Sequence, residues 1–324
     1  MNGFAVIFLL ILQFNYRIEN NWGFYYNSNI FKMSSQEISE FKTGLYSFKF
    51  PYKSLDDLVI DANFKFYLSF LQKAKRSVQL GSNVTVNHFV NNPIKDYISL
   101  GSNFDFRISK INLNISTIYL PEHLIRYYRP VNSNTYKPCM FQRKRLSFEI
   151  TYTTEKLRWS NQIGYWIDKY NQEFSYYDSR NLGANFALSH KLFEEYMYFL
   201  EYSFVNSSAK GPIPDISHTD HRINFDFSFL PGKHRIRRTS FYGSLTYRLY
   251  KSENPPQLDY IHAGRYEFYY NVGIKAQIRV SYGIYSTITL ERSWRNSYSS
   301  VYSDIGNLKN YSAFKIGANF NFRT

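Results

Sequence analysis

The stretch Ile60–Phe70, IDANFKFYLSF, decides the fold class because apolar and polar side chains alternate along its whole length. One face carries only apolar residues: Ile60, Ala62, Phe64, Phe66, Leu68 and Phe70. The opposite face carries Asp61, Asn63, Lys65, Tyr67 and Ser69. A period of two is that of a strand whose two faces meet different surroundings, and no helical period competes with it here. The alternation returns at 78–87 and 222–229, so the sequence predicts an all-β protein.

Similar segments recur along the rest of the chain. About fourteen strands can be placed by their alternation, with counts from about twelve to sixteen also compatible, and the first is expected near 40–51. Short connections, such as 107–110 and 153–156, alternate with long ones, such as 120–143 and 252–263. An even strand number and this rhythm of loop lengths are typical of a transmembrane, antiparallel, up-and-down β-barrel whose two chain ends lie on one side.

The composition agrees with a barrel wall. Aromatic residues make up 20% of the chain, with 31 Tyr and 29 Phe, although charged residues also make up 20%. In a membrane barrel one face of every strand meets lipid and the other lines the interior, and aromatic girdles mark both interfaces. We therefore expect residues 40–324 to form the barrel and its outer face to contact lipids. A nucleic-acid partner is not expected, because the rings share faces with Leu, Ile and Val instead of lining a basic groove.

The last predicted strand carries a more specific pattern. A basic residue, a glycine and two aromatics follow one another at defined spacing in Lys315, Gly317, Phe320 and Phe322. This segment resembles the C-terminal insertion signal of bacterial outer-membrane proteins of the porin-like class, although Arg323 and Thr324 follow where that class usually ends on the aromatic. The resemblance implies location in a Gram-negative outer membrane, contact with lipopolysaccharide and assembly by the insertion machinery. It implies no particular substrate.

The N-terminal region reads as a leader. Phe4–Leu12, FAVIFLLIL, has the length of a signal-peptide core and is too short for a membrane-spanning helix. We expect residues 1–21 to be a leader and 22–39 a periplasmic segment; a buried apolar strand at 4–12 is the alternative. The single cysteine, Cys139, excludes an internal disulfide and a cysteine-rich metal site.

Charged residues on the polar faces of the strands are the candidate functional residues, because these faces would line the barrel interior. The predicted lining residues are Lys65, Asp105, Arg145, Glu149, Arg158, Arg222, Asp226, Arg248, Arg265, Glu267, Lys275, Arg279 and Glu291. With Asp61, Asp168, Glu201 and Lys315, which also lie on polar strand faces, nine basic candidates stand against eight acidic ones, so the charges of the polar faces nearly cancel. The net charge of +14 is therefore expected to reside largely in turns, including 232–238, GKHRIRR, where basic side chains meet anionic headgroups or dock a periplasmic protein.

These features predict a channel or transporter for small solutes. A secretion or surface-assembly barrel with a protein partner is the first alternative, and a hydrolase active at the barrel rim is the second. His218, Asp220 and His221 are weak candidates for a metal site, since two imidazoles and a carboxylate can ligate Zn²⁺, but a solvated polar loop explains them better. We expect no catalytic residue and no cofactor, and the sequence leaves the oligomeric state open.

Overall fold

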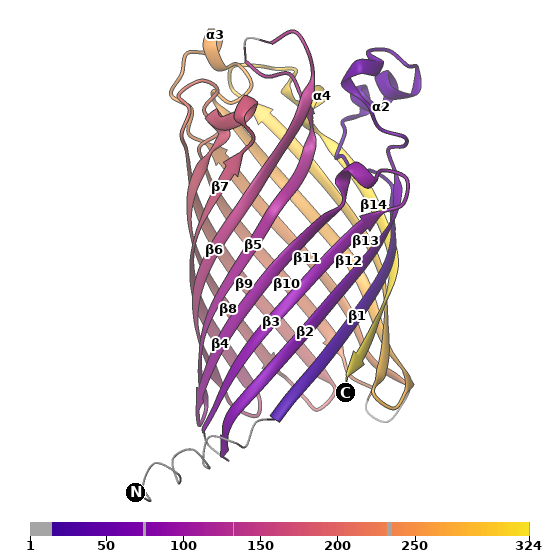
Figure 1. The fold of residues 1–324 in the computed structure, drawn as a ribbon, viewed down its shortest axis with the longest axis vertical. Coiled ribbons are helices and arrows are strands. Elements are labelled where there is room, and N and C mark those ends of the chain that lie inside the picture. The colour runs from indigo at the N-terminus through magenta and orange to yellow at the C-terminus, as the bar shows by residue number, and fades with distance from the viewer. Residues whose placement is uncertain (1–14, 74–75, 132, 232–234, 324) are drawn as a thin grey trace, which may run out of the picture.

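The computed structural model describes residues 15–73, 76–131, 133–231 and 235–323, and these form one closed sheet of fourteen antiparallel strands (Figure 1). The strands are β1 (Asn15–Asn27), β2 (Asp57–Lys73), β3 (Arg76–Phe89), β4 (Tyr97–Ile108), β5 (Ile111–Tyr128), β6 (Lys137–Thr153), β7 (Leu157–Tyr170), β8 (Ser179–Lys191), β9 (Tyr196–Ala209), β10 (His218–Phe229), β11 (Ile236–Tyr250), β12 (Arg265–Ser281), β13 (Ile284–Ser299) and β14 (Tyr311–Arg323). Each strand pairs with the next along the chain, and β1 pairs with β14. The predicted all-β, up-and-down barrel is confirmed.

The two ends of the barrel differ in the length of their connections. Short turns such as 109–110 and 282–283 lie at the end where β14 finishes, which we call the short-turn end. The opposite, long-loop end carries the helical segments α2 (Ser35–Lys42), η1 (Ser47–Lys49), η2 (Pro93–Lys95), η3 (Gln172–Tyr177), α3 (Pro256–Asp259) and α4 (Ile305–Lys309). The alternation of short and long connections therefore matches the prediction. No helix among the described residues is long and apolar enough to cross a membrane.

The N-terminal part of the barrel differs from the prediction. Residues 1–14, most of the expected leader, lie outside the described residues, but 15–27 form wall strand β1 instead of the end of a leader and the start of a periplasmic segment. Residues 28–56, which we call the inner loop, connect β1 to β2 at the long-loop end. The strand expected near 40–51 is wrong. A capping box between Ser34 and Glu37 begins a helix there, and Gly44 and Tyr46 adopt positive φ angles, which end extended structure.

The connection expected at 120–143 is also much shorter than predicted. β5 continues to Tyr128 and β6 begins at Lys137, so most of the expected loop is sheet. Their pairing contains register shifts between Leu120 and His123 and between Leu124 and Arg126. Such bulges change which residues share a face, and this conceals the alternation in the sequence.

The inner loop packs against the inner wall near the barrel mouth. Its residues Phe31 and Tyr52 stack with ring centroids 3.6 Å apart, and both belong to a buried cluster with Val59 of β2 and Phe89 of β3. The Tyr52 hydroxyl also accepts a hydrogen bond of 2.8 Å from the backbone N–H of Tyr127 on β5. This segment is therefore fixed inside the wall formed by the first five strands.

The outer wall is apolar and carries rings at two levels. Outward residues such as Leu80, Phe104, Leu200 and Leu290 are 39–49% exposed. Outward rings pair near the long-loop end, where Tyr270 and Trp294 stack at 5.1 Å, and near the short-turn end, where Tyr196 and Phe229 lie 5.3 Å apart. The remaining outward pairs include Tyr266 with Tyr298 and Tyr152 with Trp159. An apolar band between two aromatic levels is the exterior of a transmembrane barrel.

Candidate functional site: the charged lumen

The predicted lining residues lie on the inner face of the barrel, as strand alternation and register require. Arg145, Arg222, Arg248 and Glu291 line a central cavity of about 610 Å³. Glu149, Arg158, Asp226 and Lys275 line a second cavity of about 690 Å³ toward the short turns. Arg265 and Glu267 lie near the mouth, and Lys65, Asp105 and Arg279 occupy inner-face positions elsewhere along the wall. Their role in conduction stays a prediction.

The central cavity is enclosed by the wall and by one residue of the inner loop. Its charged lining residues are Lys32, Arg145, Glu201, Asp220, Arg222, Arg248, Glu291 and Lys315. Arg248 donates two hydrogen bonds to Asp220, of 2.7 and 2.8 Å, which is the bidentate geometry of a closed ion pair. Because Glu201 lines both this cavity and the second one, the two cavities adjoin along the lumen.

The second cavity, which we call the lower cavity, contains a tighter charge network. Asp226 accepts hydrogen bonds from Arg238 at 3.0 Å and from Lys275 at 2.6 Å, and it also accepts one from Ser228. The sequence analysis placed Arg238 in a basic turn, but the residue belongs to β11 and its guanidinium points at the lumen wall. Residues 232–234 of the expected docking run lie outside the described residues. Arg238 is therefore part of the lumenal network.

The buried carboxylate of Glu267 connects β12 to β13 just below the mouth of the barrel. Glu267 has no exposed surface, and its carboxylate accepts hydrogen bonds from Arg265, from the Ser297 hydroxyl at 2.7 Å and from the Tyr269 hydroxyl at 2.5 Å. Arg295 lies 3.6 Å from the same carboxylate. A single carboxylate therefore neutralises part of the charge of two arginines, and these groups link β12 to β13.

The inner loop is held across the mouth by charge as well as by packing. Glu37 of α2 forms an ion pair with Arg126 of β5, although the loop leaves the wall at β1, four strands away. Lys49 lies 3.7 Å from Glu37 and 2.9 Å from Glu40. Burial opposes ionisation of Glu37, but the charge and hydrogen bond of Arg126 outweigh it and hold the pKa of Glu37 below its usual range.

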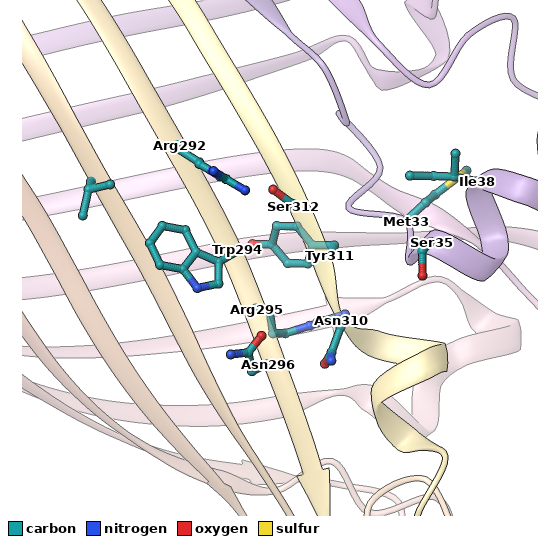
Figure 2. Close-up of a pocket in the computed structure, with 11 residues that line it drawn as sticks. Met33, Ser35, Ile38, Arg292, Trp294, Arg295, Asn296, Asn310, Tyr311 and Ser312 are labelled. Atoms are coloured by element: carbon teal, nitrogen blue, oxygen red, sulfur yellow. The ribbon is translucent and has the colours of Figure 1, made fainter.

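A third cavity, of about 680 Å³, lies at the barrel rim between the inner loop and strands β12 to β14, and both outward-facing and inward-facing wall residues border it. Figure 2 shows Met33 and Ile38 on the α2 side, and Trp294 of β13 and Tyr311 of β14 on the strand side. Arg292 also borders this cavity, and its guanidinium lies 6.0 Å from the Trp294 ring centroid. α2 is thus connected to the wall by specific contacts, with open space between them.

The structure does not assemble the weak metal candidates. Asp220 points inward and is paired with Arg248, whereas His221 points outward and lies 2.8 Å from the Tyr202 hydroxyl. His218 shares the inner face with Asp220, at 3.8 Å. In the part of the chain that the structure describes, no group of three or more His, Cys, Asp or Glu residues could hold a metal ion. Alternation along β10 explains the separation, since adjacent residues of a strand face opposite sides.

The residues of the C-terminal signal divide between the two faces of β14. Lys315 and Gly317 face the interior, and Phe320 and Phe322 face outward. A side chain at Gly317 would place Cβ 2.5 Å from the Cβ of Tyr25, so glycine is required where Tyr25 crosses the inner face. The Lys315 ammonium then lies 3.9 Å from the Tyr25 ring centroid. The role of these residues in membrane insertion stays a prediction.

Sequence reasoning missed the lumenal charges that depend on loop packing. Lys32 and Glu37 fell in the segment expected to be periplasmic, and Arg126 fell in an expected loop. Arg295, near the end of β13, and Lys309 of α4 lie at the mouth, and neither was among the predicted lining residues. Only the capping box Ser34–Glu37 could have shown that the segment after β1 is ordered.

Comparisons with known proteins agree with this architecture. No protein-family model matches the chain, and no curated protein matches it in sequence. Among solved structures, the outer membrane channel DcaP of Acinetobacter baumannii matches with a TM-score of 0.50 at 8% identity, over 96% of this chain and 97% of that one. The anion-selective porin from Comamonas acidovorans gives 0.48 at 6% identity over 96% and 99%, and a bacterial polysaccharide outer membrane secretin gives 0.47 at 8% over 94% and 98%. At such identities the likeness concerns the fold.

Proposed function

We propose that this protein is an outer-membrane channel through which small solutes pass. The observation that carries the proposal is the charged lumen, with adjoining cavities of about 610 and 690 Å³ lined by basic and acidic residues. A barrel that only anchored other parts would gain more stability from a lumen filled with packed side chains. In an eight-stranded barrel, side chains nearly fill the interior. A barrel of fourteen strands is wider and leaves space along its axis.

Membrane location is part of the same proposal. The apolar outer band and the two levels of aromatic residues support it, as does the pattern of Lys315, Gly317, Phe320 and Phe322. In this orientation the short-turn end faces the periplasm and the long-loop end faces outward. Lipids of the outer membrane, including lipopolysaccharide, would surround the wall. The inner loop would then form the constriction on the extracellular side.

A thiol-blocking experiment tests the channel. In a Cys139→Ser background, Ser244→Cys places a thiol in the central cavity, and Leu245→Cys places one on the outer wall one residue further along β11. A bulky neutral methanethiosulfonate should reduce the single-channel current of Ser244→Cys in a planar bilayer. Leu245→Cys is the matched control and should keep its current. A folded barrel without steady conductance, or equal block in both variants, would refute the proposal.

A further inference from the structure

We propose that the central cavity selects small anionic solutes, and that Lys32 of the inner loop is the charge that sets this preference. The inference rests on the proposed channel function and assigns its substrate class. The sequence analysis found nearly equal numbers of basic and acidic lining residues. The loop alters that balance, because it adds a lysine that the wall does not neutralise.

The charges of the central cavity do not cancel. Five basic side chains line it, and three carboxylates face them from Glu201, Asp220 and Glu291. Both carboxylate oxygens of Asp220 accept hydrogen bonds from Arg248, so these two charges compensate each other. The four remaining cations are Lys32, Arg145, Arg222 and Lys315, against the two remaining carboxylates. The cavity therefore keeps an excess of two positive charges.

The four remaining cations have neutral partners. Arg222 donates to Asn224 at 2.7 Å, and Arg145 donates to Ser147 at 2.9 Å. Lys315 lies over the Tyr25 ring, and the Lys32 ammonium lies 5.7 Å from the Tyr311 ring centroid. Within the described ranges, none of the four has a carboxylate oxygen within 4.0 Å. Their charge is thus available to a solute in the cavity.

The remaining carboxylates of the cavity are held by neutral donors. Glu201 accepts hydrogen bonds from Asn224 at 2.5 Å and from Ser203 at 3.3 Å, and Glu291 accepts one from Tyr242 at 3.0 Å. All three donors are neutral, so they add no positive charge beside the carboxylates. They also fix the carboxylates against the wall, so the preference for anions comes from the difference in number.

A turn at residues 29–33, closed by hydrogen bonds, holds Lys32 in place. Its backbone has a φ of 53° and its N–H donates to the carbonyl oxygen of Asn29 at 3.2 Å. The Asn29 side chain bonds both the N–H and the carbonyl oxygen of Met33, each at 2.9 Å, and the carbonyl oxygen of Ser312 on β14 at 3.2 Å. A lysine in the left-handed region is unfavourable unless its surroundings impose it. The turn therefore orients the ammonium into the lumen.

The surroundings of Lys32 add to the positive potential. Burial inside the barrel, together with the charges of Arg295 and Arg248, lowers the pKa of Lys32. Next to the cavity, toward the mouth, the network of Arg265, Arg295 and Glu267 contributes one further uncompensated charge. An anion entering from the long-loop end would pass this network before it meets Lys32.

The size of the effect follows from Coulomb's law. A positive unit charge ~7 Å from a monovalent anion in water raises the occupancy of the anion by about threefold. It lowers the occupancy of a monovalent cation at the same distance by about the same factor. Screening by salt reduces this, so low ionic strength is needed. Neutralising Lys32 should lower the chloride-to-potassium permeability ratio by at least about threefold.

Reversal potentials in a KCl gradient across a planar bilayer test the inference. The wild type should prefer chloride, and Lys32→Gln should lower that preference. Lys42→Gln is the matched control, because it removes an exposed lysine from the same loop and lies away from the cavity. Lys32→Arg should retain the preference. Arg222→Gln should also lower the chloride preference, because it removes a positive charge of the wall from the same cavity. It is the second variant if Lys32→Gln fails to fold, and heat-modifiable gel migration reports whether each variant has folded.

The outcomes separate the two proposals. If Lys32→Gln and Arg222→Gln conduct with the reversal potential of Lys42→Gln, anion selection by this cavity is refuted while the channel stands. If the wild type conducts but prefers potassium, the inference is likewise overturned. If the folded wild type carries no steady current, the channel itself is refuted and the inference falls with it.

Discussion

Replacing Glu37 with glutamine is expected to release the inner loop from the barrel mouth. Glutamine keeps the size of the side chain and can still complete the capping box of α2 with Ser34, so the helix start is preserved. What is lost is the negative charge between Arg126 and Lys49. Arg126 then remains largely buried, with its side chain 12% exposed, and without its carboxylate partner.

The magnitude follows from that burial. Removing one partner of a buried ion pair costs about 3–5 kcal/mol, and the low end applies here because the pair retains some exposure. At about 1.4 kcal/mol per factor of ten, a loss of about 3 kcal/mol reduces the ratio of docked to undocked loop by about a hundredfold. A loop that rarely leaves the mouth in the wild type would leave it often in Glu37→Gln.

Single-channel recording measures this change. Glu37→Gln should show a larger mean conductance and rapid current fluctuations. Glu173→Gln is the control, because it breaks an ion pair with Lys137 at the same end that is exposed to solvent and therefore contributes little to stability. The pKa of Glu37 lies below its usual range, so the stabilisation is present above that range and is lost as pH falls through the lowered pKa. Acidification through that lowered pKa should therefore make the wild type resemble Glu37→Gln. Indistinguishable traces from the Glu37 and Glu173 variants would refute the reasoning.

Two further changes test the charge network at the mouth. Glu267→Gln should lower the urea midpoint of barrel unfolding, followed by gel migration, because Arg265 and Arg295 would lose a fully buried carboxylate; an unchanged midpoint would show that the network contributes no stability. Burial and nearby positive charges, that of Arg265 first among them, lower the pKa of Lys309 to about 7. The lysine loses its charge as pH rises through that value, so the chloride preference should decrease between pH 6 and pH 8. Lys309→Gln should remove this step, and a step that persists would assign it to another group.

The wall strands could be predicted because each residue has only two environments. A side chain of β2 or β10 points either outward or into the lumen, and the alternation in Ile60–Phe70 records that choice directly. β1 has the same alternation in Tyr16, Ile18, Trp22 and Phe24, but Asn20 interrupts it, and the apolar run before it favoured a leader. β1 was therefore not predicted, because its first residues were assigned to the leader.

The site was predictable only where it belongs to the wall. Arg222 and Glu291 were found from strand alternation alone. Lys32 was not, because its position depends on the Asn29 turn, on packing of Phe31 against Tyr52 and on attachment to β14. These are contacts between segments far apart in the sequence, and no local pattern near residue 32 records them.

The pairing of β1 with β14 has a consequence for assembly. The side chain of Asn321 donates to that of Asn21, which lies 300 positions earlier in the chain. The first strand therefore cannot complete its hydrogen bonds until the last has been made and delivered, and loop closure over such a distance is slow. During that interval both margins of the growing sheet carry unpaired backbone groups that invite pairing with other chains. During biogenesis these two edge strands must be kept from pairing with neighbouring copies of the chain. A truncation that removes either β1 or β14 should therefore cause the protein to aggregate.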